Sequence, residues 1–383
     1  MSLLSSITGF FGYSNARTNQ VTIEVAGRVI SGWTSLSIRR GIEIMPSTFE
    51  LECTEYFPKS SEVLIPEGES CIIRIGDQKI ITGYIVTVNR RIGYGTHVVS
   101  VQGNSKSIDL CECSAKFETY QFNNRPVIDL IRTICSPYGI DVKTVGDIDN
   151  VVLPQFSVIL TETGYEIIER MTRAAALLFY DDADGNIILS KVGSRVVSSG
   201  FVEGKNVEEA VVRRSMAGRF SNVTMILQNT SSLFSAPGDN SQLAAQFENI
   251  TTGKPATDPG VKRYRPMLIS AEMGDMGYVV SQQRAQWEVN RRFGRSQSIQ
   301  VVTDSWRDQQ GKLWEPNTLV PVSFPTLKVN TKNHLLIAEV VFRLDMGGGT
   351  HAEITLMPKE AFSPQPIVLN AANSAVVQAI AGR

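Results

Sequence analysis

Two stretches in opposite halves of the chain carry the same five-residue motif between β-rich runs. The motif Gly-x-Gly-Thr-His occurs at 93–97 within the run 83–103, and again at 347–351 within the run 338–356. Glycine supplies the positive φ that a tight hairpin turn requires, and β-branched residues fit the pleated strands beside it. We therefore predict a β-hairpin at each place, and the pair suggests two versions of one β-domain.

A second and weaker repeat supports this duplication. The residues Ile-Arg-Arg at 38–40 precede Ser-Thr-Phe-Glu-Leu at 47–51, and Val-Arg-Arg at 212–214 precedes Gly-Arg-Phe-Ser-Asn-Val at 218–223. In both places a strand with paired arginines comes before an aromatic strand start. Two unrelated antiparallel hairpins are the alternative, since such turns are common. Duplication is favoured because both repeats occur in the same order along the chain.

The segment from Val21 to about Cys113 is predicted to be β throughout. Apolar Val21, Ile23 and Val25 alternate with polar residues, which is the pattern of a half-buried strand, and the same alternation recurs at 49–53 and 71–75. Several short strands in so few residues indicate a small antiparallel barrel or sandwich.

Helical signals begin after Asn123. Asn124 is expected to cap a helix with Pro126 in its first turn, and Pro137 and Gly139 are expected to end it. The apolar stripe of this helix consists of Val127, Ile128, Leu130, Ile131 and Ile134.

A second helix starts at the capping box formed by Thr163 and Glu166, and its apolar spacing continues to Leu178. The turn at 182–186 then leads into a strand at 187–189, so this middle section reads as α+β. A third helix is predicted over 277–292.

The expected fold class is mainly β with α+β, with two similar antiparallel β-barrel domains, an inserted α+β domain and a discontinuous helical segment. The predicted boundaries are an N-terminal extension 1–20, a first β-barrel 21–113, an α+β domain 114–204, a second, discontinuous β-barrel 205–227 and 297–358, a mobile loop and helix 228–296, and a C-terminal tail 359–383.

Length and charge restrict the class of protein. A chain of 383 residues is too long for one core, and a formal net charge of −1 argues against a broad surface that grips phosphates. The apolar runs are shorter than a membrane span, and the first residues make a poor signal peptide. The cysteines at 53, 71, 111, 113 and 135 form an odd, dispersed set that suits reduced thiols made in a cytoplasm.

The residue types that catalysis needs do not form a recognisable constellation. His97 and His351 lie at equivalent places in the two repeats, which favours a structural role, and His334 has no motif around it. Cys111 and Cys113 could bind a metal, but no second pair completes four ligands, so a strand end with two small thiols is favoured. We therefore predict no catalytic, cofactor-binding or metal-binding residues and no cofactor.

Two carboxylate patterns were weighed as further sites. Asp182-x-Asp184-Gly185 resembles part of a calcium loop but lacks the later bidentate Glu, and Asp-Gly turns are common. Glu166 and Glu169 share a helix face, but Glu166 is already needed for the capping box. Hydrolysis by a carboxylate pair is therefore disfavoured.

Basic residues cluster in and after the third predicted helix, with a further pair at Arg90-Arg91. Solvated faces and ion pairs are favoured over nucleic-acid contacts, because aromatic residues for base stacking are not interleaved with the arginines, apart from Trp287 and Phe293. The cluster consists of Arg284, Arg291, Arg292 and Arg295.

Four segments together resemble one known family. The segments 261–266, 284–296, 313–322 and 349–358 resemble the baseplate hub protein, also called the 43 kDa tail protein, of Mu-like contractile phages and prophages. The order of elements matches over nearly the whole chain, although the loop 228–259 carries no matching motif. The hub of type VI secretion spikes is related to this family by fold.

The resemblance implies a structural protein of the phage tail rather than an enzyme. It implies a homotrimer whose two barrels per subunit form a pseudo-sixfold ring between the tail tube protein and the central spike protein, in contact with other baseplate proteins. DNA would pass through without specific binding, and no stable membrane insertion is expected. The implied location is the virion, in the baseplate, with assembly in the host bacterial cytoplasm.

Two other classes of protein remain as alternatives. A tail-associated cell-wall hydrolase should show an acidic pair or a metal cluster, and neither is visible in the sequence. A carbohydrate-binding β-module should expose repeated aromatic residues, yet aromatic residues make up only 8% of the chain and its tryptophans are scattered.

Overall fold

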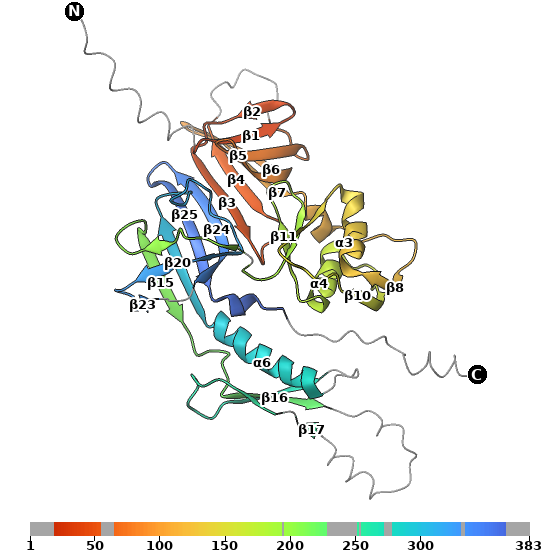
Figure 1. The fold of residues 1–383 in the computed structure, drawn as a ribbon. Helices are drawn as coiled ribbons and strands as arrows, with labels where there is room; N and C mark the ends of the chain where they lie inside the picture. Colours follow the sequence, from red (N-terminus) through yellow and green to blue (C-terminus); the bar gives the residue numbers. More distant parts are fainter. Residues whose placement is uncertain are drawn as a thin grey trace, which may run out of the picture.

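One large, mainly antiparallel sheet dominates the computed structural model, and it contains strands from both halves of the chain (Figure 1). The structure describes residues 19–54, 65–193, 195–227, 251–252, 254–271, 278–330 and 334–364. Among these residues thirteen strands join the sheet, in the order β15-β20-β25-β24-β3-β4-β7-β6-β5-β1-β2, with β21 beside β24 and β13 beside β21. The prediction of a mainly β chain is confirmed.

The N-terminal half supplies seven of these strands. In most of them apolar residues alternate with polar ones, so that one face of the strand is buried, as in β1 where Val21, Ile23 and Val25 point inward. The strands are β1 (Val21–Val25), β2 (Arg28–Ile30), β3 (Ser35–Gly41), β4 (Thr48–Cys53), β5 (Ser70–Ile75), β6 (Gln78–Gly93) and β7 (Thr96–Ser105).

The C-terminal half supplies the other six. They are β13 (Arg195–Val196), β15 (Glu209–Arg214), β20 (Gln297–Thr303), β21 (Thr318–Val320), β24 (Leu335–Asp345) and β25 (Gly349–Met357). β24 and β25 form the second predicted hairpin, as β6 and β7 form the first, so both hairpin predictions are confirmed.

The two halves repeat one strand order. We call β3, β4, β7, β6 and β5 the first β unit, and β15, β20, β25, β24 and β21 the second β unit, because neighbours in each sequence pair antiparallel in the same way. Each hairpin has a β-bulge on its first strand, at Val86 and at Ala338, and seven residue pairs lie between bulge and turn in both. The duplication is therefore visible in topology and in register.

The register fixes which residues are equivalent. Across the first unit Ile38, Phe49, Gly103 and Ile85 lie in one row, and across the second unit Val212, Ile299, Leu356 and Ile337 do. Because Ile38 and Val212 hold the same place in the two rows, residues 38–40 are equivalent to residues 212–214. The predicted match of the arginine pairs is therefore confirmed.

The two Gly-x-Gly-Thr-His motifs differ by one residue in their position relative to the strand pairing of their hairpins. The first hairpin closes with the two-residue loop 94–95, and the second closes with the three-residue loop 346–348. His97 lies opposite Ile92, whereas His351 lies opposite Arg343, one position further from its turn. The expectation that the two histidines are equivalent is wrong, because the extra loop residue shifts the motif along the strand.

The second part of the weaker repeat is also wrong. The strand β16 (Asn222–Leu227), which begins within the predicted match at 218–223, does not pair with β15. β20 takes that place, because residues 215–296 are inserted between the two strands. In the first unit the short connection 42–47 joins β3 to β4 directly.

Both units share one hydrophobic core, which runs from Ile23 and Phe49 in the N-terminal half to Trp306 and Ile354 in the C-terminal half. The two units contact each other through β24 and β3, and the pairing of these strands makes the sheet continuous. The pairing of the described strands closes neither half into a barrel, so barrel closure stays a prediction.

A second core belongs to the α+β section between β7 and β13. The helix predicted after Asn123 begins later than expected, because Pro126 is its N-cap and Asn124 lies in a strand with φ 55°. The capping box of Thr163 and Glu166 is confirmed, but Leu178 belongs to the next strand. The elements are α2 (Ile108–Glu112), β8 (Gln121–Pro126), α3 (Val127–Cys135), η1 (Ser136–Tyr138), β9 (Val142–Val145), β10 (Val152–Ser157), α4 (Gly164–Ala174), β11 (Leu178–Asp181) and β12 (Ile187–Ser190).

The insertion between β15 and β20 folds into a small sheet with one helix against it (Figure 1). The helix α6 (Tyr278–Arg295) is the third predicted helix and extends three residues beyond the predicted end. The sheet contains β16, β17 (Thr251–Thr252), β18 (Ala256–Thr257) and β19 (Pro266–Ala271). Of the loop predicted at 228–259, residues 228–250 and 253 lie outside the described residues.

Short elements complete the described chain. β14 (Phe201–Val202), β22 (Val322–Phe324) and β23 (Val329–Asn330) form a separate three-stranded sheet, and η3 (Lys359–Phe362) follows β25. The predicted extension 1–20 and the predicted tail 359–383 lie mostly outside the described residues.

Candidate functional site

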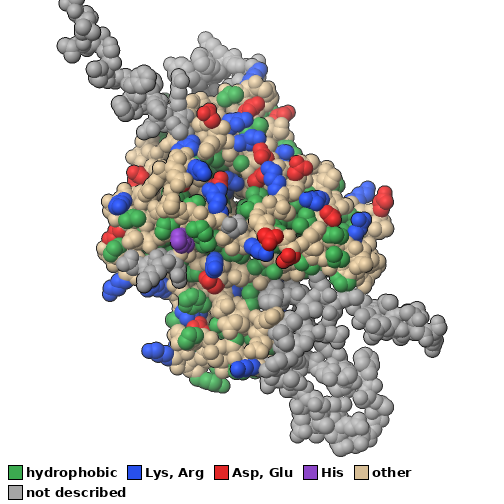
Figure 2. Space-filling model, in the orientation of Figure 1, with side chains coloured by type: hydrophobic (Ala, Val, Ile, Leu, Met, Phe, Trp, Pro, Cys, Tyr) green, Lys and Arg blue, Asp and Glu red, His purple; other side chains and the backbone are tan. Residues whose placement is uncertain are grey.

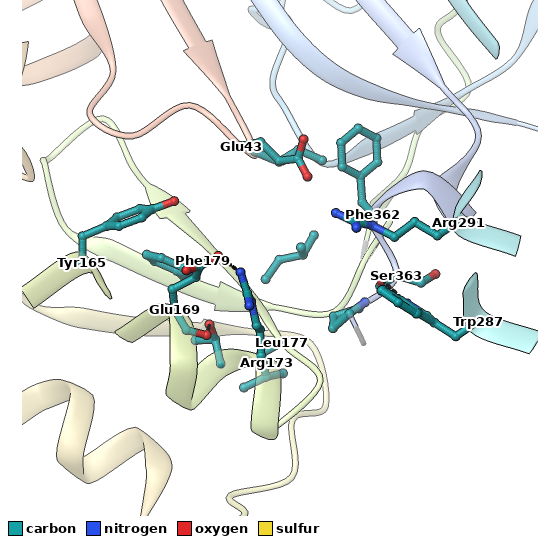
Figure 3. A pocket seen from close by; sticks show the side chains of 14 residues that line it. Glu43, Tyr165, Glu169, Arg173, Leu177, Phe179, Trp287, Arg291, Phe362 and Ser363 are labelled. Atoms are coloured by element: carbon teal, nitrogen blue, oxygen red, sulfur yellow. Dashed lines mark hydrogen bonds and ion pairs between the residues drawn. The ribbon is translucent and has the colours of Figure 1, made fainter. Parts of the chain in front are cut away.

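A cavity of about 310 Å³ lies where three sections of the chain meet (Figure 3). The connection after β3 contributes Glu43, α4 and β11 contribute Tyr165 and Phe179, and α6 and η3 contribute Trp287 and Phe362. Figure 3 shows the α4 and β11 side chains on one side of the cavity and those of α6 and η3 on the other. The cavity thus marks the joint between the first β unit, the α+β section and the insertion.

Two ion pairs lie in or beside this cavity. Glu169 pairs with Arg173 one helical turn away, and Glu43 accepts a hydrogen bond from Arg295. The guanidinium of Arg291 lies 5.3 Å from the ring centre of Trp287. Loss of solvent lowers the pKa of Arg291, and the nearby positive charge of Arg295 lowers it further.

The predicted cluster of basic residues on α6 serves largely as internal links. Arg292 donates to Glu288 at 2.7 Å and to the Gly218 carbonyl at 3.0 Å, and Arg295 donates to the Ala361 carbonyl at 3.2 Å. These bonds tie α6 to the start of the insertion and to η3. The prediction of ion pairs is confirmed for these two arginines.

A groove of about 550–570 Å³ is found on each of two faces next to the sheet. One lies along α6 and β15 and is lined by Arg213, Arg291 and Arg292. The other lies beside the β11–β12 turn and contains Arg40, whose buried Nε has no hydrogen-bond partner. Arg40 is equivalent to Arg214 in the second unit, so both grooves lie near the paired arginines.

The buried carboxylate of Asp181 joins the first β unit to the α+β section. It accepts hydrogen bonds from the Ser47 backbone N–H at 2.8 Å and from the Ser47 hydroxyl at 2.7 Å. The hydroxyls of Ser105 and Ser107 donate to it as well. Because Asp181 is only 2% exposed, these donors replace the water that its charge requires.

The sequence analysis missed this joint. The available signal was a carboxylate at the end of the apolar strand β11, together with two serines at the end of the long strand β7, Ser105 as its last residue and Ser107 two residues later. Nothing in the spacing indicates that residues so far apart in sequence meet, so the joint could only be found in three dimensions.

His351 has two partners, one on each ring nitrogen. Its Nδ1 lies 2.8 Å from a Glu208 carboxylate oxygen, and its Nε2 contacts the Gly348 carbonyl. Loss of solvent alone would lower the pKa of His351, but the bonds to Gly348 and Glu208 outweigh it and hold the pKa above its usual value. The residue therefore braces the loop 346–348 against the start of β15.

The other residues considered as sites have structural surroundings. Cys111 lies in α2 and Cys113 caps it, so the predicted strand end is wrong because the chain turns helical after β7. Burial raises the pKa of the Cys111 thiol to about 12, with further contributions from Asp181 and Glu112. In the described ranges no group of three or more His, Cys, Asp or Glu residues could hold a metal ion.

The predicted Asp-Gly turn is confirmed between β11 and β12. The Asp182 carboxylate accepts hydrogen bonds from the backbone N–H groups of Asp184 and Asn186 at 2.8 and 2.9 Å. Lys143 lies 2.7 Å from Asp182, and Lys79 lies 2.6 Å from Asp184. The hydrogen bond from Lys79 is the main reason that the pKa of Asp184 is lowered. Both carboxylates therefore have lysine partners.

Comparison with known proteins follows the same division of the chain. Residues 20–105 match the model of the Mu phage baseplate assembly protein GpP-like N-terminal domain, and residues 107–191 match the baseplate hub protein gp44-like second domain. Residues 278–365 match the fourth domain of the Mu phage baseplate assembly protein GpP. No helix in the described part of the chain is long and apolar enough to cross a membrane.

Whole proteins align with most of this chain. The baseplate hub protein gp44 of Escherichia phage Mu is 30% identical over 348 residues, which cover 90% of this chain and 89% of the relative. The 43 kDa tail protein of prophage MuSo2 from Shewanella oneidensis superposes with a TM-score of 0.78 at 28% identity, over 91% of this chain and all of that one.

A more distant structure shares the fold. The c3393 protein of Escherichia coli, a component of the type VI secretion system, has a TM-score of 0.51 at 9% identity, over 91% of this chain and 79% of that one. The fold relationship to type VI secretion proteins is thereby confirmed. With the matched domains in order and a relative of this identity over nearly its full length, the chain belongs to the family of Mu-like phage baseplate hub proteins.

Proposed function

We propose that this protein is the structural hub of a contractile phage baseplate, and that three copies form a ring between the tail tube protein and the central spike protein. The ring contacts other baseplate proteins, lets DNA pass, catalyses no reaction and does not insert into membranes. It is assembled in the host bacterial cytoplasm and remains in the virion.

The repetition of one strand order within a single chain is the observation that carries this proposal. A tube of sixfold symmetry and a spike of threefold symmetry need an adaptor that presents both. Three copies with two equivalent β units each present six similar surfaces, while the whole particle keeps threefold symmetry. A chain with one unit would offer three surfaces only.

The proposed domains follow from this reading. The first β unit lies within 21–113 and the second within 205–227 and 297–358, and each is proposed to complete a barrel-like layer in the assembled ring. The α+β section 114–204 and the insertion 215–296 then lie outside the strands of the two β units, where they are free to contact different partners.

Weak binding of DNA is part of the proposal, because a channel must let the genome slide. Figure 2 shows acidic and basic side chains interspersed over one face of the molecule, and the formal net charge of the chain is −1. Phosphate binding depends on clustered positive charge and falls with salt. We expect duplex binding that disappears at physiological salt, and sub-micromolar affinity there would contradict a passive channel.

Solution mass is the direct test of the trimer. Light scattering during gel filtration should give a particle of three chains of 42.1 kDa each, without a tail tube or spike present. A particle that keeps the mass of one chain at every concentration, or that sediments as a dimer, would overturn the proposed ring.

A further inference from the structure

In the described chain, two strands of the β units, β15 and β6, have one side that is wholly or partly without a strand partner. Among the described residues β15 pairs with β20 only. β6 pairs with β7 along its length after the bulge, but on its other side β5 pairs with it only as far as Tyr84, and Gly68 donates to the carbonyl of Ile85. The described chain places no strand along the far side of residues 87–93.

The second β unit shows what occupies the equivalent side of its own hairpin. There β21 ends its pairing with β24 at Leu336, and Asn317 donates to the carbonyl of Ile337, as Gly68 does to that of Ile85. Gly68 and Asn317 both have positive φ, 84° and 59°. Beyond this point β3 pairs with the free side of β24, from Glu339 to Leu344.

Because the two units are equivalent, the open side of β15 and the open side of β6 are expected to be partners of each other. β3 corresponds to β15, and β24 corresponds to β6. The contact between β24 and β3 therefore has a counterpart between β6 and β15, which a single copy does not make because these strands lie at opposite ends of the eight-strand order β15 to β6. We propose that β15 of one copy pairs antiparallel with residues 87–92 of β6 in a second copy.

The register of this contact follows from the one inside the chain. Val340 lies opposite Arg40 and Phe342 lies opposite Ile38, and translating each residue to its counterpart gives the pairs between copies. The proposed pairs, with the β6 residue first, are Val88 with Arg214, Asn89 with Arg213, Arg90 with Val212, Arg91 with Val211, and Ile92 with Ala210.

Side chains at both edges suit this pairing. Inside the chain Arg39 of β3 forms an ion pair with Glu339, which lies diagonally across from it on β24. Between copies Arg91 and Glu209 take up a diagonal of the same kind, with the charges exchanged. Ile92 is 87% exposed, and it would be covered beside Ala210.

A contact between two different edges makes a head-to-tail assembly. Each copy uses β15 towards one neighbour and β6 towards the other, so the arrangement closes into a ring when the rotation between copies permits it. The pairing also removes both open edges, which would otherwise expose backbone groups to unspecific strand addition. The number of copies in the ring, three, rests on the proposed function.

Disulfide trapping with two single-cysteine substitutions tests the pairing. In a background where the exposed Cys113 is serine, one variant carries Asn89→Cys and the other Arg213→Cys. Residues directly opposite on antiparallel strands have the Cβ separation that a disulfide needs. Mixed and oxidised, the two variants should give a covalent dimer as the main product, while neither variant alone should do so.

Two controls set the register and the chemistry. Arg39→Cys with Val341→Cys in one chain places thiols at the corresponding positions of the known contact, and must form an internal disulfide under the same oxidation. Asn89→Cys mixed with Val212→Cys represents a slip of one residue, which turns the second thiol to the opposite face. This mixture should give no dimer.

A chain with both Asn89→Cys and Arg213→Cys separates this inference from the proposed function. A covalent ladder that ends at three copies supports both, and one that ends at another number supports the strand pairing but contradicts the trimer. A trimer by mass without the mixed disulfide, while the internal control forms, overturns the pairing and leaves the trimer in place. A monomer without the disulfide overturns both.

Discussion

The first β unit continues from β7 into α2 and is tied to its neighbour by the buried Asp181, whereas the second continues from β25 into η3 and is tied by arginines of α6. Both units therefore bind a helical neighbour at the same end of the same strand order. The contacts differ completely in chemistry: one buried carboxylate in the first, half-exposed ion pairs and carbonyl contacts in the second.

This difference separates what the sheet requires from what its neighbours require. In the row that contains Phe49 and Gly103, and in its counterpart that contains Ile299 and Leu356, the buried residues are apolar or glycine, because these strands bury one face. Polar links at the strand ends carry no such constraint. The units can therefore keep one topology while holding different sections of chain.

The largest effect is expected at the turn end of the second unit. Trp306 is fully buried against Phe342, and its indole N–H donates to the carbonyl of His351 at 2.9 Å. Trp306→Ala should lower the free energy of unfolding by about 3–5 kcal/mol, because a large cavity and unpaired carbonyls remain. Denaturant titration measures this value.

A surface aromatic residue on the other hairpin is the matched control for this change. Tyr94 is fully exposed in the first turn, so Tyr94→Ala should change the same free energy by less than about 0.5 kcal/mol. Equal losses in the two variants would show that the turn ends of the two units are not braced differently.

The next effect concerns the joint that belongs to the first unit alone. Asp181→Ala leaves three buried serine hydroxyls without their acceptor, and we expect a loss of about 3 kcal/mol in the free energy of unfolding. Asp184→Ala, which removes a half-exposed partner of two lysines nearby, should cost less than about 1 kcal/mol. If the two variants unfold alike, Asp181 is not the joint.

A smaller effect should reveal how the two units pack the same row. Phe49 lies opposite Gly103, where the second unit has Ile299 opposite Leu356, so the large ring is accommodated by the glycine. A Cβ on Gly103 would lie 2.3 Å from the Tyr84 carbonyl oxygen and 2.4 Å from the Phe49 ring. Gly103→Ala should therefore cost about 2 kcal/mol by thermal or chemical unfolding.

The control for Gly103 lies in the second turn. Gly347 has ordinary space around an added Cβ, with Asp345 as its nearest neighbour at 3.5 Å. Gly347→Ala should stay within about 0.5 kcal/mol of the parent protein. A neutral Gly103→Ala would mean that the first unit can adopt the packing of the second.

The smallest effect is the pH dependence of the brace at β15. Thr34 and Glu208 hold equivalent places before β3 and β15, and each donates its backbone N–H to an equivalent carbonyl, but only Glu208 reaches a histidine. Since the pKa of His351 is raised on folding, its contribution is complete below the unfolded pKa and is lost as pH rises through the folded one.

Glu208→Gln should lower the pKa of His351 and weaken this pH dependence, as followed by NMR titration of the imidazole. Glu24→Gln on β1, which lies beyond β5 in the same sheet, should leave the titration unchanged. An unshifted His351 in the Glu208 variant would show that the Gly348 carbonyl alone holds the proton.

Local patterns predicted much of this fold. The capping box at Thr163, the alternation in β1 and the glycine turns all depend on neighbours within a few residues, and they were read correctly from the sequence. Even the equivalence of the arginine pairs in β3 and β15 was visible, because the strands share a local pattern.

The errors and omissions concern long-range choices. Phe220 looked like the start of the strand after β15, but the insertion lies between that strand and its partner, and no local signal marks an insertion. The α2 helix was hidden in a run read as β, and the joint at Asp181 unites residues from distant strands. The pairing of β24 with β3 could not be predicted from hydrophobic periodicity either, because periodicity does not show which strands are neighbours.

The pairing of β3 with β24 has a consequence for the order in which the chain acquires structure. Arg39 and its partner Glu339 are 300 residues apart in sequence. During synthesis from the N-terminus, one edge of β3 therefore remains unpaired until nearly the whole chain has been made. Contacts of such separation slow folding, and an exposed strand edge invites aggregation meanwhile. Nascent chains that stop between residues 105 and 335 should therefore be the aggregation-prone species, because they hold a complete first unit whose β3 edge is still open.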